Sequence, residues 1–324
     1  MKRLLLALLA LAVAGLAGLE GIARFALGLG DPPLTVRDEE MEYRFKPDQD
    51  VRRFGNRVVY NQWSMRSEPI EARKTRANEF RVLVLGDSVI NGGALTDQGR
   101  LATTLAEHAL ARSDRPARVL NASAGSWGPE NLSAYLRKFG LFDADVVIVV
   151  LSTHDMADVM TFPADLGPDF PLQRPLLASA ELVTRYLPRY LSMFVDPPQT
   201  TTDPLLALRA TSQDTIDRSR RALRDLIVSA RSGGAAVYVV HHPEREEPVP
   251  SDHPLLTELR AVLEDAGLPF LSTAELLGPV GRREPYYRDS IHINELGQEL
   301  YARVIVCLAS AASSVDASNC TNNR

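Results

Sequence analysis

A serine stands where an apolar stretch of the chain ends. The segment VLVLGDSVI, from Val82 to Ile90, runs from four apolar residues straight into the polar turn Gly86-Asp87-Ser88. Gly, Asp and Ser are ordinary turn residues, so the turn alone indicates no chemistry. A serine becomes a nucleophile only when a base lies beside it and a third group orients that base. The sequence must therefore supply a histidine and an acid that reach Ser88.

Among the six histidines, His292 has the most informative surroundings. It lies in YYRDSIHINELG, three residues after Asp289, and Asn294 has the residue type of an N-cap for a helix that follows. Asp289 and His292 would share one short loop. There the carboxylate can accept a hydrogen bond from Nδ1–H, which leaves Nε2 free to take a proton from Ser88. An Asp-x-x-His loop is common, so this prediction depends on a fold that brings it to Ser88.

From Phe80 onward, short apolar strands alternate with helices. The predicted strands are Arg81 to Leu85, Arg118 to Asn121, Val146 to Leu151, Ala236 to Val240 and Pro269 to Leu271. The predicted helices are Leu101 to Arg112, Pro129 to Phe139, Thr215 to Arg231, Leu255 to Ala266 and Glu295 to Leu308. Short strands rich in Val and Leu are typical of a parallel sheet covered on both faces. The alternation predicts a doubly wound α/β domain, whose ligands bind at the carboxyl ends of the strands, where Ser88 falls.

The N-terminus has the pattern of a membrane-targeting segment. Lys2 and Arg3 precede a run from Leu4 to Leu19 that contains no polar residue. We predict that residues 1–30 form an uncleaved signal-anchor, with the two basic residues in the cytoplasm and the rest of the chain exported. A signal peptide that is cleaved to release a secreted protein is the alternative.

The rest of the chain divides by composition. Residues 31–79 read as a linker and an extended N-terminal arm, residues 80–310 as the α/β domain, and residues 311–324 as a polar tail. Residues 156–212 are rich in proline and read as an insertion, either a lid over the site or a cover for the sheet, with one amphipathic piece near 177–193 that Pro188 should break or kink. In an exported domain Cys307 and Cys320 can form a disulfide; two unrelated thiols are the alternative.

Composition and motifs argue against several classes of function. The net charge of −5 and the lack of a basic stripe give no reason to expect nucleic-acid binding. Ligand-type residues around His241, His242 and His253 match no tight metal spacing, so we predict no metal. The segment GDSVINGG lacks the spacing and the lysine of a phosphate-binding loop, and no cofactor is expected.

Two blocks of the sequence together resemble the SGNH (GDSL-type) hydrolase family. GDSV follows the first strand and DSIH precedes the last helix, with SAGSWGPEN and LSTHDMAD between them. The resemblance covers about residues 81–308 and implies a flavodoxin-like α/β/α sandwich in which Ser88, Asp289 and His292 form the catalytic triad. The membrane-proximal arm with YNQWSMRS looks like a bacterial cell-surface subgroup associated with exopolysaccharide or envelope modification.

The same resemblance implies an oxyanion hole. Its donors would be the backbone N–H groups of Ser88 and of Gly125 or Ser126, together with the side chain of His154. The family usually has Gly and Asn where Ser126 and His154 stand, but a backbone N–H needs no glycine and an imidazole N–H can donate. Residues predicted to contact the substrate are Asn91, Trp127 and Asp155.

These features predict a membrane-anchored serine esterase facing the periplasm or the exterior. Its substrate would be an acyl ester, most plausibly O-acetyl, of a surface carbohydrate, and proteins of polysaccharide biosynthesis are candidate partners. One alternative is a carbohydrate O-acetyltransferase with the same triad. The other is a non-catalytic carbohydrate-binding or polysaccharide-assembly protein, which the His at position 154 mildly favours and the intact triad opposes.

Overall fold

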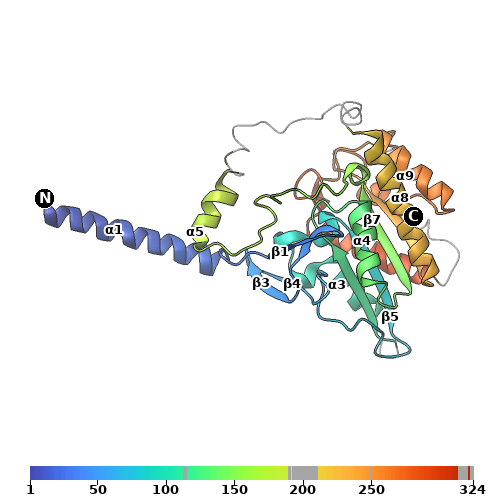
Figure 1. The fold of residues 1–324 in the computed structure, drawn as a ribbon, viewed down its shortest axis with the longest axis horizontal. Coiled ribbons are helices and arrows are strands. Elements are labelled where there is room, and N and C mark those ends of the chain that lie inside the picture. Colours follow the sequence, from blue (N-terminus) through green and yellow to red (C-terminus); the bar gives the residue numbers. More distant parts are fainter. Residues whose placement is uncertain (112–114, 189–190, 192–210, 249, 313–319, 322–324) are drawn as a thin grey trace.

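A five-stranded parallel sheet forms the centre of the main domain in the computed structural model (Figure 1). The structure describes residues 1–111, 115–188, 191, 211–248, 250–312 and 320–321. The strands are β5 (Phe80–Gly86), β6 (Ala117–Ser123), β7 (Val146–Ser152), β8 (Ala236–His242) and β9 (Leu271–Ser272), in the spatial order β6-β5-β7-β8-β9. This is the predicted flavodoxin-like order, and each predicted strand is present within a few residues of its expected ends.

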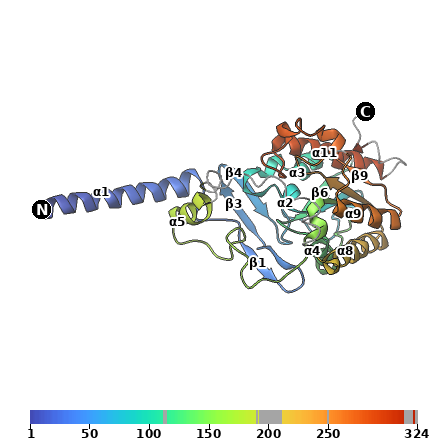
Figure 2. The same ribbon diagram turned by 90° about the horizontal axis from the view of Figure 1, so that it is seen from above.

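Helices cover both faces of the sheet (Figure 2). α3 (Ala102–Leu110) and α11 (Glu295–Ala311) lie on one face, and α4 (Pro129–Phe139), α8 (Gln213–Ser232) and α9 (Pro254–Asp265) on the other. The short helices α2 (Ser88–Asn91) and α10 (Ala274–Leu277) follow β5 and β9. Every residue of β5 is buried, with Val82 and Val84 in one core and Leu83 and Leu85 in the other. This two-sided burial explains the unbroken apolar run before Ser88.

The N-terminal arm forms two β-hairpins, which the prediction of an extended arm missed. β1 (Thr35–Asp38) pairs with β2 (Glu42–Phe45), and β3 (Gln49–Arg53) pairs with β4 (Asn56–Tyr60), both antiparallel. The turn between β3 and β4 places Phe54 and Gly55 at positive φ, a conformation that two-residue hairpin turns require. Met41 and Tyr43 from the first hairpin join the core beneath α4, so the arm is part of the domain.

One long helix projects from the domain (Figure 1). α1 (Lys2–Gly21) continues through a π-helical turn over Ile22–Ala26, and the whole is long and apolar enough to cross a membrane. α5 (Ala178–Glu181), continued by a π-helical segment over Leu182–Tyr186, runs across the end of α1 (Figures 1 and 2). The helix is described as far as Pro188, and residues 189–190, where the predicted break or kink would show, lie outside the described residues. The remainder of the predicted insertion, residues 192–210, lies outside the described residues.

The two cysteines are joined. Cys307 on α11 forms a disulfide with Cys320, with their Cα atoms 5.5 Å apart. The bridge holds Cys320 against the last helix. Disulfides persist in oxidising compartments, so the bond agrees with an exported domain.

Candidate active site

The turn after β5 positions Ser88 at the rim of the sheet. Asp87 is the N-cap of α2, and its Oδ1 accepts a hydrogen bond from the N–H of Val89 at 2.9 Å. Gly86 is confined, because a Cβ there would lie 3.2 Å from the carbonyl oxygen of Val150 on β7. β5 lies between β6 and β7, so Ser88 stands where the strand order reverses, the usual ligand site of an open α/β sheet.

The loop before α11 carries His292 to Ser88. His292 Nε2 lies 2.9 Å from Ser88 Oγ, and His292 Nδ1 lies 2.8 Å from Asp289 Oδ2. Asn294 caps α11 by accepting from the N–H of Gly297, which fixes where the loop ends. The three predicted triad residues are thus brought together in one hydrogen-bonded chain. This arrangement can move a proton from the serine hydroxyl to the imidazole.

Asp289 is held as an anion. Its Oδ1 accepts from the backbone N–H groups of Ile291 at 3.0 Å and His292 at 2.7 Å. Partial burial raises the pKa of Asp289, but the hydrogen bond to His292 and the two backbone bonds outweigh it and lower the pKa well below its usual value. An ionised Asp289 fixes the proton on Nδ1 and so leaves Nε2 as the acceptor facing Ser88.

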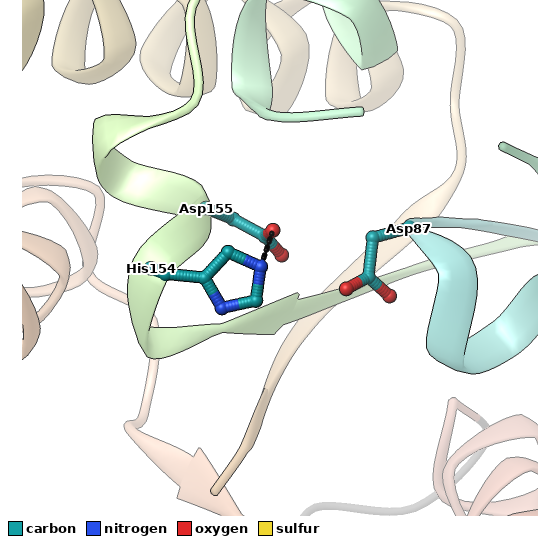
Figure 3. A group of neighbouring side chains, drawn as sticks. All are labelled: Asp87, His154 and Asp155. Carbon is teal, nitrogen blue, oxygen red and sulfur yellow. Dashed lines mark ion pairs between the residues drawn. The ribbon is translucent and has the colours of Figure 1, made fainter. Parts of the chain in front are cut away.

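His154 occupies a second carboxylate-rich site after β7 (Figure 3). Its Nε2 lies 3.3 Å from Asp155 Oδ1 and 3.9 Å from Asp158 Oδ2, and its Nδ1 lies 3.6 Å from Glu244 Oε1. Asp87 also faces this group, and its Oδ2 accepts a hydrogen bond from Ser152 Oγ at 3.1 Å. The side chain of Asp155 is fully buried, whereas that of His154 is 40% exposed.

The carboxylates around His154 make it a cation. Burial alone lowers the pKa of His154, but the contact with Glu244 and the charges of the aspartates raise it to about 10. Burial raises the pKa of Asp87, and burial together with Asp87 raises the pKa of Asp155 well above its usual value. His154 therefore carries a positive charge beside Asp87, the residue next to the candidate nucleophile, at neutral pH.

The comparison with known protein families decides the class of this site. Residues 84–300, which include Ser88, Asp289 and His292, match the model of the GDSL-like lipase/acylhydrolase family. The chain belongs to this family. The predicted resemblance to this family is thereby confirmed, as is the class of enzyme, an ester hydrolase of the GDSL type. The search of curated proteins gave no significant match.

Several solved structures are similar to this GDSL acylhydrolase at low sequence identity. TesA is 16% identical with a TM-score of 0.44, covering 71% of this chain and 97% of its own. A catalytic mutant of the acetylxylan esterase Axe2 from Geobacillus stearothermophilus is 13% identical with a TM-score of 0.42, covering 74% and 95%. A two-domain esterase active on acetylated mannans is 14% identical with a TM-score of 0.43, covering 74% and 51%.

The turn after β6 holds the remaining backbone donors predicted for this acylhydrolase. Ser126 has a φ of 53°, a left-handed conformation uncommon for a residue with a side chain. The carbonyl oxygen of Gly125 accepts from the hydroxyl of Tyr43, which fixes this turn against the N-terminal arm. A Cβ at Gly128 would lie 2.1 Å from the carbonyl oxygen of Asp158, so only glycine fits there. Among the described residues, the N–H groups of Ser88 and Ser126 form no hydrogen bond and stay available.

Two residues predicted to contact substrate are engaged inside the protein. The side chain of Asn91 is buried, where it accepts from Tyr60 at 2.9 Å and donates to the carbonyl of Ser123 at 2.7 Å. Trp127 is buried beneath the arm and donates from Nε1 to the carbonyl of Tyr43. Asp155, the third of these residues, is buried too and contacts His154. All three support the site from within, because the arm covers the surface on which the first two were expected to lie.

The residues around His154 are of the types that bind metal ions. One ligand atom from each of Asp87, His154 and Asp155 lies within 4.8 Å of the others. The imidazole ring itself lies 3.3 Å from Asp155 Oδ1, and Asp155 Oδ2 accepts from the backbone N–H of Ser152 at 2.7 Å. That this group holds no metal stays a prediction.

Sequence reasoning did not foresee how Arg288 holds the triad loop. Its Nη2 donates to Thr96 Oγ1 at 2.7 Å, and its Nε donates to the carbonyl of Ile293 at 3.0 Å. Its backbone N–H donates to the carbonyl of His292 at 2.8 Å. Arg288 thus joins the loop that carries the histidine to the segment after the nucleophile helix. The only signal in the sequence was its position next to Asp289.

A cavity of about 230 Å³ lies at the ends of β8 and β9. His241, Glu247, Arg260, Phe270 and Ser272 are among its lining residues. His241 contacts Thr153 through Nε2 at 2.8 Å and Ser272 through Nδ1 at 2.9 Å, so both ring nitrogens are occupied. This buried network braces the turn that carries His154.

Proposed function

We propose that this protein is a membrane-anchored serine esterase that removes small acyl groups, above all O-acetyl, from a carbohydrate outside the cytoplasm. The observation that carries the proposal is the hydrogen-bonded chain from Ser88 Oγ through His292 to Asp289. Its order and distances are those of an activated serine nucleophile.

The reaction follows from these contacts. Ser88 Oγ attacks the ester carbonyl while its proton passes to His292 Nε2, and Asp289 stabilises the imidazolium that forms. His292 then gives the proton to the sugar oxygen as the C–O bond breaks, which leaves Ser88 acylated. A water molecule loses a proton to His292 and attacks the acyl-enzyme, and the carboxylic acid leaves as Ser88 regains its proton.

Three groups support the oxyanion. The N–H groups of Ser88 and Ser126 form no hydrogen bond to any described residue, and the cationic His154 lies within 4.8 Å of Asp87, the residue before Ser88. Loss of one such group costs about 3 to 4 kcal/mol of transition-state stabilisation in known acyl-transfer enzymes. The ring nitrogens of His154 face carboxylates, so its contribution is mainly its charge rather than a hydrogen bond aimed at the substrate.

The surroundings of Ser88 favour a hydrophilic substrate. The side chains of His292 and Asp289 are 37% and 48% exposed, so the site opens onto the surface. The side chain that reaches Ser88 Oγ is the imidazole of His292, and Asp87 precedes Ser88 in the chain, so polar groups flank the nucleophile. An open, polar site admits an ester that projects from a bulky sugar chain, whereas a long acyl chain would need apolar surface to bind.

The N-terminal helix is proposed to stay on the mature protein. Ala23 at its end is buried against Leu29 and Ala178, and Glu20 accepts hydrogen bonds from the N–H groups of Ala178 and Ser179, both at 2.9 Å. Cleavage of the chain before Glu20 would leave these contacts intact. Cleavage after Ala23 would remove side chains that pack against the rest of the protein. Retention of α1 places the catalytic domain on the far side of the membrane from Lys2 and Arg3.

The test is covalent labelling together with product analysis. The full-length protein in detergent is treated with a fluorophosphonate serine probe, with Ser88→Ala as the control. Labelling of the wild type alone, with release of acetate from acetylated oligosaccharides, is the expected result. Transfer of the acetyl group to an added sugar would instead favour the acetyltransferase. A wild type that neither labels nor turns over any ester would contradict the proposal and favour a binding protein.

A further inference from the structure

The end of α1 and the α5 helix form one packed unit. Glu20 caps the N-terminus of α5, as its carboxylate also accepts from Ser179 Oγ at 2.8 Å, while it pairs with Arg24 at 2.8 Å. Ala178 lies so close to Gly30 that a Cβ there would be 3.1 Å from the Cβ of Ala178. The position of α5 is therefore fixed relative to the apolar helix.

A buried ion pair fixes the other side of the α5 helix. Glu181 pairs with Arg53 at the end of β3, and both side chains are almost fully buried. Glu181 also accepts from the backbone N–H of Gly30 at 2.7 Å, and Tyr186 accepts from Arg53 at 2.9 Å. Ala178, Glu181 and Tyr186 therefore form the face of the helix that is turned toward the protein.

The opposite face is mainly apolar and has no cover among the described residues; Thr184 is exposed there too, with its hydroxyl donating to the carbonyl of Ala180 at 2.8 Å. Val183 and Leu187 are one helical turn apart, and their exposed fractions are 51% and 43%. Leu176 and Leu177 stand exposed just before the helix, and Phe25 is exposed at the end of the apolar helix. A polar face held by Glu181 and an apolar face turned outward are typical of a helix that lies in a membrane surface.

The length of the apolar run sets the depth of this helix. The run from Leu4 to Leu19 spans about 24 Å at 1.5 Å per residue, less than the roughly 30 Å of a bilayer's hydrocarbon core. A helix needs about 20 residues to cross the hydrocarbon core, so the segment just after the run, around Glu20 and Ala23, lies at the edge of the hydrocarbon. Because Glu20 bonds directly to the N-terminus of α5, that terminus lies at the same depth.

We propose that the apolar face formed by Leu176, Leu177, Val183 and Leu187 is buried in the lipid of the bilayer that α1 crosses. The occupant is the acyl-chain region of the outer leaflet, continuous with the lipid around α1. The protein then has two membrane contacts, a crossing helix and a surface helix joined to it through Glu20. Together they fix how the catalytic domain sits above the membrane, which one helix on a flexible linker could not do.

The test measures lipid contact at single positions in the full-length protein. Both native cysteines are paired with each other, so an added cysteine is the one reactive thiol. Four single-cysteine variants are made: Val183→Cys, Leu187→Cys, Leu11→Cys and Val228→Cys. Each is labelled with an environment-sensitive dye. The labelled proteins are reconstituted in phosphatidylcholine–phosphatidylglycerol vesicles whose acyl chains carry nitroxide. Val228 is a matched control, an exposed valine (63%) on α8, a helix on the far side of the domain from α1 (Figure 1).

Lipid burial predicts that the dye loses fluorescence to the nitroxide at positions 183 and 187, as it does at position 11, and keeps it at position 228. Quenching at position 11 with none at positions 183 and 187 would overturn the proposal. Blue-shifted but unquenched emission at 183 would overturn it too, since another part of the chain or a protein would then cover the face. Neither outcome depends on the activity of Ser88, so the proposed esterase is tested separately.

Discussion

Two histidines stand at the rim of the same sheet, each beside aspartate, and their ring nitrogens face different partners. His292 has one carboxylate on Nδ1 and the hydroxyl of Ser88 on Nε2. His154 has carboxylates near both nitrogens, Asp155 on one side and Glu244 on the other. Their exposure is similar, at 37% and 40%. The two histidines differ in the partner of the second nitrogen rather than in exposure, and the proposed roles, a base for His292 and a fixed cation for His154, rest on that difference.

The largest expected effect comes from removing the base. His292→Gln should lower kcat by about 10⁴-fold or more, since no group is left to take the proton from Ser88. The measurement is steady-state kinetics with a soluble acetyl ester, with folding checked by circular dichroism. The KM should change little, because the imidazole acts on the proton rather than on the bound sugar. Retention of activity within tenfold would mean that another residue is the base.

Asp289→Asn should have the next largest effect. An asparagine keeps the shape but loses the charge that holds the proton on Nδ1 and stabilises the imidazolium. Replacing a buried triad aspartate by asparagine lowers kcat by about 10⁴-fold. We expect a loss in kcat of about 10³-fold here, because the side chain of Asp289 is 48% exposed and water can partly replace its charge. The matched comparison is Asp289→Glu. A loss as small as tenfold would show that the backbone already fixes His292.

His154 should matter through its charge, with an effect of about 10²-fold. His154→Ala and His154→Asn both remove the cation, but asparagine keeps an N–H donor like the residue usual in the family. If charge dominates, the two variants lose similar activity. If a hydrogen bond to the oxyanion dominates, His154→Asn should retain most of the wild-type kcat while His154→Ala loses about 10²-fold.

The fold was predictable because its signals are local. The run VLVLGDS, the other apolar strands and the N-cap at Asn294 each depend on neighbouring residues, and their order along the chain set the topology. The triad could be predicted from the same local signals, because the turn with Ser88 follows a predicted strand and the loop with Asp289 and His292 precedes a predicted helix. Residues whose surroundings come from distant segments were harder to place. Asn91 and Trp127 looked like substrate contacts until the arm, through Tyr60 and Tyr43, covered them.

The surroundings of His154 show the same limit. LSTHDMAD places Asp155 and Asp158 beside it in sequence, but Glu244 comes from the loop after β8 and Asp87 from the turn after β5. No local pattern reveals that four acids meet at one imidazole. The sequence could therefore place His154 near the oxyanion, but not foresee that its nitrogens face carboxylates.

The smallest expected effect is a pH dependence of stability that comes from His154. Its pKa rises on folding from 6.5 to about 10. A raised folded-state pKa adds stability that is complete below about pH 6.5 and disappears as the pH climbs toward 10. Because the side chain of His154 is 40% exposed, water screens part of its interaction with the carboxylates, and the effect on stability is modest. The melting temperature of the wild type should fall over this interval more steeply than that of His154→Asn. Parallel curves would show that His154 is not a fixed cation, and the contrast with His292 would then rest on geometry alone.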